Sequence, residues 1–562
     1  MDRNTLLAFL LISLVLIFTP KYMELVSPTV EVGPSSDTTS VELTSSAGRN
    51  RYLEKGYSDP KEKPTLKKLE IISWDKEKGE IKNDEETILI ETALYSANIS
   101  SINGGTLKSF FTKEYQSSDS AHLNLLRGLN PNNLALFIQD LDGNPLNLKK
   151  AWKLETTHVP NFLTETHSLL FSLNILGGKV TKTLTFAPDS YLIDVEFNCE
   201  GVSNKIFRDL QVGWFGGLSP TEEDEVGDQV YFKSYIYQGG ELEDQKVKID
   251  KSEKNTFNGP ADWVAIRTKY FVSALIPKDP SIIEKTILSS TYDGREIYNA
   301  SFLLSSRNKS SFSLYLGPLE YDKIKAVGVD LDMVMDFGWA PIRPVSKGVL
   351  YALKGIHGFI PNYGLVLIVF SFLVKLLVYP LTKKSYQSTS AMQSIQPEIN
   401  LLREKYKSNP NKLNQATMKL YKEKGVNPLG GCLPMLLQMP LLLALFQVFR
   451  TTIELRSEPF IWWIKDLSAP DTVVHLPFNV PIYGDQISIL PILMVISMFI
   501  QQRMMAPNAQ QPQQKTMQYF MTGFFFLMFN SFPSGLNLYY TLFNVLTIAQ
   551  QKFVPSAAPS KK

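Results

Sequence analysis

The chain has 562 residues, of which 44% are hydrophobic and 20% charged, and its net charge of +2 indicates neither a nucleic-acid partner nor an acidic one. Two distant cysteines and five scattered histidines form no disulfide framework and no cluster at metal-ligand spacing, so we expect no metal and no cofactor. These averages hide a division. Residues 55–340 are charged and alternating, whereas apolar residues gather in one early block and five late ones, which indicates a water-soluble part and a membrane part.

The amino terminus carries an apolar run, residues 6–18, behind the charged residues Asp2 and Arg3. Its length fits a signal peptide, but no small-residue cleavage pattern follows it. We therefore predict an uncleaved transmembrane anchor over residues 1–26 with a cytoplasmic amino end, and keep a cleaved signal peptide as the alternative. Residues 27–64 are rich in Ser, Thr, Pro and charge, which predicts a flexible linker.

Residues 65–340 alternate apolar and polar positions in short runs. In one of these runs Tyr191, Ile193, Val195 and Phe197 are expected to face one side of a sheet. Turn residues such as Asn103-Gly104-Gly105 and Gly177-Gly178 separate the runs. The pattern predicts an antiparallel β-sandwich, and the segment is long enough to hold its own core.

Residues 341–360 form the next predicted element. Apolar residues recur at helical spacing between Ile342 and Phe359, opposite Arg343, Lys347 and Lys354. This predicts an amphipathic helix in the membrane interface. The alternative is a helix that packs on the soluble domain.

Five apolar blocks follow, and with the anchor they predict six membrane crossings. The blocks are residues 363–381, 429–449, 487–505, 516–530 and 532–550, within a five-helix core at 361–552. Residues 382–427 hold nine Lys and Arg against three Glu, whereas residues 451–486 hold two basic and five acidic residues. The positive-inside rule therefore makes the first segment cytoplasmic and the second external, and the short tail at 553–562 cytoplasmic as well.

The segment 382–427 has a helical pattern of its own. Met392, Ile395, Ile399, Leu402 and Tyr406 fall at steps of three and four, a break follows at 408–411, and Leu413 and Leu420 resume the seam. This predicts a cytoplasmic helical hairpin of coiled-coil type. Its basic surface suits anionic lipid or a ribosome, and the alternative is an ordinary solvated face.

Lys375 stands out because it lies inside the apolar block 363–381. The next charge, Lys383, is roughly 12 Å further along a helix, so snorkelling does not fully hide the ammonium. A charge at that depth costs a few kcal/mol and normally faces water, a partner or a functional cavity. Ser371, one turn earlier, points the same way.

Other polar residues occupy the later blocks. Gln438 lies between two prolines in the third crossing, and Asn537, Tyr540, Thr541 and Asn544 share one face of the last crossing. The alternative is that such groups only bond helix to helix. Residues 517–529 and 536–548 are short for a bilayer core, which favours a hydrated groove in thinned lipid. The predicted groove residues are Lys375, Ser371, Gln438, Asn537 and Tyr540.

Several short motifs resemble the YidC/Oxa/Alb family of membrane insertases in its long bacterial form. The longest is the run from Asn427 to Pro434 with Gln438-Met439-Pro440 after it. Three further motifs of the core are Tyr379-Pro380-Leu381-Thr382, Asp466-Leu467-Ser468, and Phe532-Pro533-Ser534-Gly535 with Leu538-Tyr539-Tyr540 after it; Asp336-Phe337-Gly338-Trp339 is similar to the junction before the core. Their order along the chain is more specific than any one of them.

The resemblance implies a non-enzymatic insertase of the bacterial inner membrane, with a periplasmic β-supersandwich and a five-helix core. It implies that Lys375 holds the place of the groove cation, which is usually arginine, that Ser371 matches a groove hydroxyl, and that Tyr540 lines the client path. A lysine keeps the charge and loses the bidentate fork. The implied partners are nascent membrane proteins, the Sec translocon, the translating ribosome and the phospholipid bilayer.

The hypothesis is thus an insertase in which client segments pass through a hydrated groove open to cytoplasm and lipid, and client helices leave into the bilayer. A polytopic solute transporter or channel is the alternative, since it also places a charge and broken helices at the membrane midplane, although no convincing internal repeat supports it. An intramembrane hydrolase lacks support, because no crossing supplies a histidine or carboxylate base.

Overall fold

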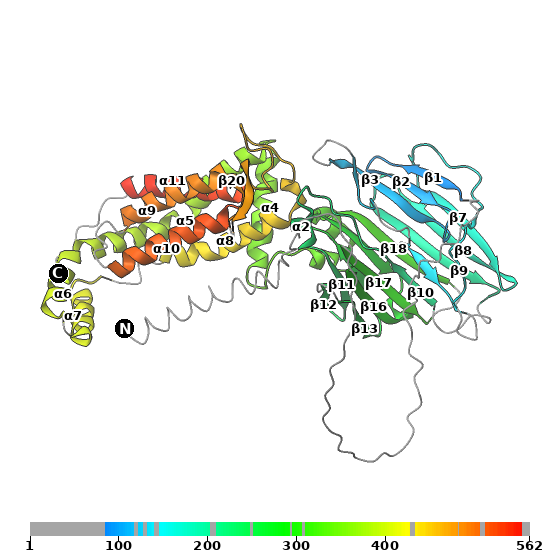
Figure 1. The fold of residues 1–562 in the computed structure, drawn as a ribbon, viewed down its shortest axis with the longest axis horizontal. Coiled ribbons are helices and arrows are strands. Elements are labelled where there is room, and N and C mark those ends of the chain that lie inside the picture. Colours follow the sequence, from blue (N-terminus) through cyan, green and yellow to red (C-terminus); the bar gives the residue numbers. More distant parts are fainter. Residues whose placement is uncertain are drawn as a thin grey trace, which may run out of the picture. The chain divides into compact units, whose positions relative to one another are not determined.

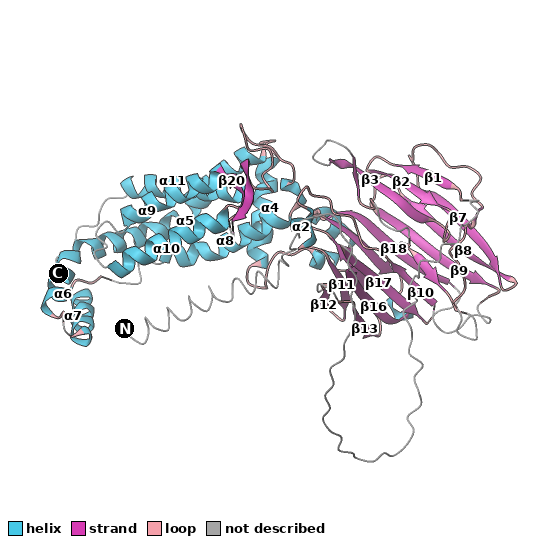
Figure 2. Cartoon of the chain, in the orientation of Figure 1, coloured by secondary structure: helices cyan, strands magenta, loops and turns pink. Residues whose placement is uncertain are grey.

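The computed structural model describes residues 85–553, apart from 117–121, 128–131, 140–144, 203–209, 248–250, 293–294, 306–308, 408, 427–432, 481–482 and 506–511. The predicted anchor at 1–26, the linker at 27–64 and the tail beyond residue 553 lie outside the described residues. Most strands lie in the first part of the described chain and most helices in the second (Figure 2). The first part is rich in antiparallel sheet and the second is helical, as the sequence predicts.

The described strands of the first part form three antiparallel sheets (Figure 1). A four-stranded sheet runs in the order β1 (Thr87–Glu91), β2 (Tyr95–Ser100), β3 (Thr106–Gln116) and β4 (His122–Asn124). A five-stranded sheet runs β13 (Glu253–Asn258), β16 (Ile283–Tyr292), β17 (Glu296–Leu304), β10 (Leu210–Trp214) and β5 (Ala135–Phe137). A nine-stranded sheet runs β12 (Glu241–Gln245), β11 (Lys233–Gln238), β14 (Trp263–Arg267), β15 (Phe271–Pro277), β18 (Lys309–Pro318), β9 (Leu192–Glu200), β8 (Gly178–Phe186), β7 (His167–Ile175) and β6 (Lys153–Leu154).

The nine-stranded and five-stranded sheets pack against one another through β11, β14 and β17. The period-two pattern explains this packing, because alternate side chains of a strand point to opposite faces. The four residues predicted to share one face, Tyr191, Ile193, Val195 and Phe197, are all buried, and Asp194 between them is exposed. The alternation in the sequence therefore identified the core-facing side of β9.

Two predicted turns lie between paired strands or beside the core. Leu176 and Gly177 both have positive φ, 51° and 70°, between β7 and β8, which matches the twist of a two-residue hairpin loop. Gly104 has φ 68°, and a Cβ there would lie 2.6 Å from the Trp152 ring, so a larger residue does not fit. These residues fix where the strands reverse.

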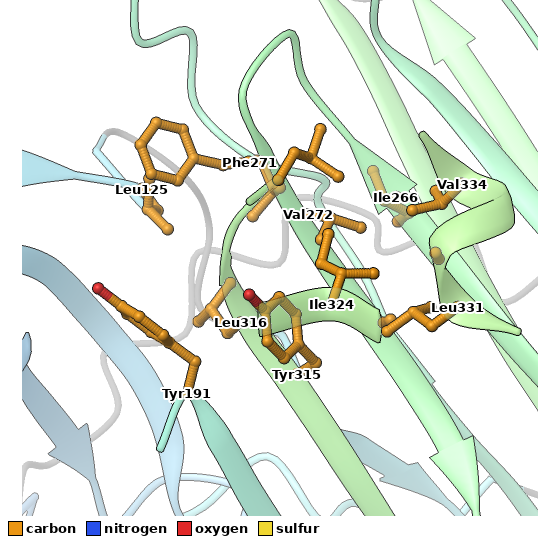
Figure 3. Close-up of a cluster of buried hydrophobic side chains, with 14 of the residues drawn as sticks. Leu125, Tyr191, Ile266, Phe271, Val272, Tyr315, Leu316, Ile324, Leu331 and Val334 are labelled. Carbon is orange, nitrogen blue, oxygen red and sulfur yellow. The ribbon is translucent and has the colours of Figure 1, made fainter. Parts of the chain in front are cut away.

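The core of this part extends from the sheets onto two short helices, α3 (Tyr321–Val327) and the 3-10 helix η2 (Leu331–Val334). Figure 3 shows Ile324 of α3 and Leu331 and Val334 of η2 directed toward the strand residues Ile266 and Val272. All five side chains are buried. The segment that leaves the sheets is therefore anchored to them before the helical part begins.

Helix α4 (Arg343–His357) is the amphipathic element predicted at 341–360. Val349, Leu350 and Leu353 are buried against neighbouring helices, and Lys347 donates to Asp332 at 2.8 Å. Its exposed positions carry no charge; they include Gly348, Tyr351, Ala352, Gly355 and, just past the helix, Phe359. Together with the helix that follows, α4 lines an open apolar groove of about 760 Å³.

The remaining helices run alongside one another (Figure 1). They are α5 (Tyr363–Ser394), α8 (Leu433–Thr451), α9 (Ile489–Met505), α10 (Pro512–Phe529) and α11 (Ser534–Phe553). Between α8 and α9 lie the short helix η4 (Ile453–Leu455) and the two-stranded sheet β19 (Thr472–Val480) and β20 (Gly484–Ser488). Of the described helices, α5 alone contains a segment, Tyr363–Pro380, long and apolar enough to cross a membrane; Ile489–Met504 is apolar but shorter.

Helix α5 does not end with its apolar block but continues to Ser394. Residues 381–394 contain no proline or glycine, so nothing in the sequence stops the helix there. Beyond it, α6 (Gln396–Lys405) and α7 (Pro410–Glu423) pack around a small core of Ile395, Ile399, Leu420 and Val426. The predicted seam residues Ile395, Ile399 and Leu420 therefore do meet.

Candidate functional site

The ammonium of Lys375 is covered by α11. Its side chain is in α5 and the residue is only 8% exposed. Nζ donates a hydrogen bond of 2.7 Å to Thr547 Oγ1 and lies 4.3 Å from the centre of the Phe543 ring. A hydroxyl acceptor and the negative face of an aromatic ring both stabilise a cation without neutralising it.

No ion pair among the described residues involves Lys375. Thr547 in turn donates its hydroxyl hydrogen to the carbonyl of Phe543 at 2.6 Å, so the oxygen is oriented to accept from the lysine. A buried cation held by neutral groups remains strongly attractive to an anion, because the surrounding medium screens charge poorly.

Ser371 lies one turn before Lys375 on α5 and is fully buried. Its hydroxyl donates to the carbonyl of Leu367 at 2.7 Å, which is a bond within its own helix. On the α11 side, Asn544 donates from Nδ2 to Ser497 Oγ of α9 at 3.2 Å. The polar groups near Lys375 thus tie α5, α11 and α9 into one wall.

The other predicted groove residues lie at different levels. Tyr540 packs edge-on against Phe529 at 5.8 Å, and its buried hydroxyl has no hydrogen-bond partner within the described part of the chain. Asn537 is at the opposite end of α11 from Thr547, where Nδ2 donates to the carbonyls of Phe529 and Phe532 at 3.1 and 3.3 Å. Gln438 is half-buried in α8. The structure brings Lys375 and Ser371 together, and it leaves Asn537 holding the turn between α10 and α11.

Thr547 and Phe543, which contact the ammonium of Lys375, are not among the site residues predicted from the sequence. The polar face predicted for α11 runs from Asn537 to Asn544. Thr547 lies three residues after Asn544 and therefore belongs to the same face. That spacing was the available signal. The sequence holds no such signal for Phe543, because an aromatic residue in an apolar helix normally serves only to pack against its neighbours.

Two of the motifs contact one another and close one end of the bundle. The carbonyl of Asp466 accepts from Ser534 Oγ at 2.7 Å, and the carbonyl of Leu467 accepts from the backbone N–H of Gly535 at 3.0 Å. Ser468 N–H donates back to the Asp466 carboxylate at 2.7 Å. The loop 466–471 therefore sits on the amino-terminal end of α11.

The same loop caps α9. Asp471 Oδ2 accepts from the backbone N–H groups of Ile489 and Leu490 at 3.0 and 2.8 Å, which are orphan donors of a helix start. Asn530, after α10, donates to the carbonyls of Tyr483 and Gln486 at 2.8 and 2.7 Å. We name residues 466–471, β20 and the α10–α11 turn the loop cap, and it joins three helices at one end.

Comparison with known proteins identifies the family. The model described as YidC periplasmic domain matches residues 87–343, and the one described as 60Kd inner membrane protein matches residues 355–561. The chain is 34% identical to the membrane protein insertase YidC of Chloroherpeton thalassium, over 99% of this chain and 96% of that protein. The chain belongs to the YidC family of membrane protein insertases. A second YidC, from Chlorobaculum tepidum, is 37% identical over 84% of this chain and 82% of its own length.

A solved structure of an active YidC insertase covers 84% of this chain and 93% of its own, with 20% identity and a TM-score of 0.35, so the assignment rests on the sequence relatives. The resemblance seen in the motifs is confirmed, and the relatives favour the insertase over the transporter. The YidC family is one of inner membrane proteins with a periplasmic domain. It accounts for the two-part organisation of the chain.

Proposed function

We propose that this chain inserts client proteins into the bacterial inner membrane along a path between α5 and α11 that centres on Lys375. The observation that carries the proposal is a buried ammonium held by Thr547 and Phe543, with no carboxylate bound to it among the described residues. An acidic client segment takes the place of Thr547 at Nζ. Its apolar segment then partitions into lipid, driven by hydrophobic transfer.

The rest of the wall suits the same task. Ser371 and Tyr540 line the path on the loop-cap side of the ammonium, Gln438 is half-buried in α8, and Asn537 offers Oδ1, which has no partner among the described residues. Lysine attracts a carboxylate as a point charge and, unlike arginine, does not form a bidentate pair of hydrogen bonds with it. The contact with a client carboxylate is therefore easily formed and easily broken.

The proposed topology has six crossings: the anchor, α5, α8, α9, α10 and α11, with the amino end and the α6–α7 hairpin in the cytoplasm and residues 65–340 outside. Contacts between α5 and α11 support the alternation, because Lys375 meets Thr547 and, further along both helices, Thr382 accepts from Gln550 at 3.1 Å. The two helices therefore run in the same direction, as crossings two and six must. The loop cap then closes the external end, and the path opens toward the cytoplasm.

Client membrane proteins and the bilayer are the partners that an insertase requires. The Sec translocon and the translating ribosome are further proposed partners, the latter at the basic hairpin. Two carboxylates of the hairpin, Glu398 and Glu423, pair with Lys424 and Lys419. Further lysines such as Lys412 and Lys422 remain on its exposed surface for an anionic partner.

The test is insertion of a small client into liposomes that contain the purified full chain, read by protease protection. Lys375→Met removes the charge while keeping the bulk, and we expect insertion of a client with an acidic translocated segment to fall about tenfold, or about 1.4 kcal/mol. A neutral client should be affected less, and Lys375→Arg should retain insertion. The matched control is Lys383→Met, at an exposed position further along α5.

Equal insertion of the acidic client by the Lys375→Met variant would remove Lys375 from the mechanism. Passage of solute without any client insertion would instead support the transporter. The two outcomes are separable because each has its own readout in the same vesicles.

A further inference from the structure

An exposed apolar surface lies on the connection between α8 and α9. Its residues, which we name the tryptophan face, are Ile461, Trp462, Val474 and Phe478. Trp462 is 85% exposed and Phe478 is 62% exposed. Several large apolar side chains exposed on one short connection do not normally face water, so the surface calls for a partner.

The backbone directs Trp462 outward at a cost. Its φ is +51°, in the left-handed region that a bulky residue rarely adopts. The neighbouring Trp463 is stacked on it at 5.8 Å and is itself fixed by a 2.9 Å hydrogen bond from Nε1 to Asp471. A glycine would fit this backbone without strain, so the strained conformation of an exposed tryptophan points to a use for the indole.

The chemistry of the tryptophan face suits a lipid surface. Strand β19 carries one titratable side chain, His475, and the nearest exposed charges in the sequence are Lys465 and Asp485, of opposite sign. A face with so little charge offers nothing to a nucleic acid or to a charged protein. Tryptophan and phenylalanine are the residues that gather at the headgroup level of a bilayer.

The position of the face identifies which surface it meets. Strand β20 ends at Ser488 and α9 begins at Ile489 without a linker, so the hairpin is joined directly to a membrane helix. Leu493, Ile496 and Ile500 form an exposed apolar stripe on α9 at steps of three and four. In a family of inner membrane proteins this stripe contacts lipid, and the β19–β20 hairpin lies at the end of α9 where the stripe begins.

We propose that the tryptophan face lies in the boundary between headgroups and acyl chains of the adjacent leaflet, with Trp462, its most exposed residue, as the anchor. The partner is phospholipid, recognised by its apolar upper layer and not by a specific headgroup. The contact holds the loop cap at a fixed height on the bilayer. It does not depend on the client path.

The experiment places the full chain in phosphatidylethanolamine and phosphatidylglycerol vesicles whose acyl chains carry bromine either near the headgroup or near the bilayer centre. Tryptophan fluorescence is compared between the unaltered chain and Trp462→Phe, and the difference reports Trp462. We expect bromine near the headgroup to quench at least half of that difference signal, and bromine near the centre to quench it clearly less.

Two further variants keep the test decisive. Phe478→Trp in the Trp462→Phe background moves the reporter to another residue of the face, and the same shallow quenching is expected. Phe162→Trp in that background places an exposed reporter on the β-rich part, where Phe162 is 47% exposed, and no bromine effect is expected there.

Equal fluorescence of Trp462 in brominated and plain lipid would overturn the proposal. A signal that changes with the protein-to-lipid ratio but not with bromine would overturn it too, and would place a second copy of the chain on the face. Neither result bears on client insertion, which is measured separately in the same vesicles.

Discussion

Lys375 and Thr547 form a contact that holds a buried ammonium. The ammonium has few described polar neighbours, so the hydroxyl of Thr547 carries an unusual share of its stabilisation. Phe543 adds a cation–π contact at 4.3 Å. Changing the acceptor alone therefore tests how the resting site is held.

We predict that Thr547→Val lowers the thermal stability of the helical bundle by about 1–3 kcal/mol, because a buried donor loses its acceptor at nearly constant side-chain volume. Thr547→Ser should restore most of the loss. Helical circular dichroism during heating in detergent measures it. An unchanged midpoint for the valine variant would show that the hydroxyl does not hold the ammonium.

Lys182 is a second buried lysine, in the β-rich part. Its Nζ donates to the carbonyls of Leu134, Gly105 and Asn103 at 2.9, 3.1 and 3.5 Å, and the side chain is fully buried. Burial lowers the pKa of Lys182 from 10.5 to about 7. The folded chain thus binds its proton less tightly than the unfolded chain does.

The sign of the effect follows from proton counting. Between pH about 7 and 10.5 the unfolded chain binds more protons at this group, so its contribution favours folding increasingly as pH rises. We predict a slope of at most about 1.4 kcal/mol per pH unit, and its loss in Lys182→Met. Hydrogen exchange of β8 amides in the full chain measures it, with Lys179→Met, a 42% exposed side chain on the same strand, as control. Parallel slopes in the unaltered chain and the Lys182→Met variant would contradict the prediction.

A single residue was predictable where its type conflicts with its surroundings. Lys375 stands out in an apolar block, whereas Lys182 lies in an alternating strand that contains another lysine, Lys179, and carries no such signal. Thr547 was hidden for a related reason. A hydroxyl inside a helix usually bonds its own backbone, and Thr547 does this while also accepting from Lys375.

At the level of elements, the start of α11 is packed too closely for any side chain at Gly535. A Cβ there would lie 2.5 Å from the Phe449 ring and 3.0 Å from the Leu467 carbonyl that bonds the same backbone. The motif that contains Gly535 is therefore a packing requirement of the loop cap. It keeps α8, α11 and the loop 466–471 in contact.

We predict that Gly535→Ala lowers the free energy of unfolding by about 1–3 kcal/mol through overpacking. Gly523→Ala, in α10 with open space around the new Cβ, should instead raise stability by up to about 1 kcal/mol because alanine is the better helix former. Thermal unfolding of the two variants in the same detergent compares them. Similar midpoints for both would contradict the packing argument.

Element types were predictable from periodicity, and element ends were less so. The alternation of β9 and the three-four spacing of the α6–α7 seam both reappear in the buried residues. The carboxyl end of α5 was not predicted. The apolar residues end at 381, but the residues that follow still allow a helix, which continues to Ser394. A helix that passes from an apolar to a polar environment keeps the same backbone conformation.

At the scale of the whole molecule, Arg456 joins the connection after α8 to the β-rich part. Its guanidinium donates to Glu222 at 2.8 Å and to the carbonyls of Gln116 and Thr221 at 2.8 and 3.3 Å. The Arg456 side chain is 4% exposed and that of Glu222 is 17% exposed. Glu222 lies just before the short helix α2 (Glu225–Gln229). The first residue of that helix, Glu225, forms a second ion pair, with Arg127, and this pair is exposed.

We predict that Arg456→Met costs up to about 3 kcal/mol, because it leaves a half-buried carboxylate and two carbonyls without their donor. A double-mutant cycle with Glu222→Gln should show strong coupling. Arg127→Ala, which breaks the pair that is 73% and 54% exposed, should stay within about 0.5 kcal/mol. Equal effects of the Arg456 and Arg127 variants in thermal unfolding would contradict the prediction.

Long-range pairs of this kind were out of reach of sequence reasoning. Composition and charge asymmetry separated the soluble part from the membrane part, and the motifs indicated the family. Nothing local, however, links Arg456 to Glu222 across the chain. Only the packing of two distant segments reveals that pair, and the same holds for Ser534 with Asp466.

The loop cap gives the bundle a pivot. Helices α9, α10 and α11 are fastened at one end by Asp471, Asn530 and the carbonyls of residues 466–467, so a rigid helix among them can swing only at its far end. Thr547, toward the other end of α11, is the residue that contacts Lys375 of α5. A rigid rotation of α11 about its fastened end would move Thr547 further than Gly535, so it would lengthen the Lys375–Thr547 contact while the loop cap stayed in place.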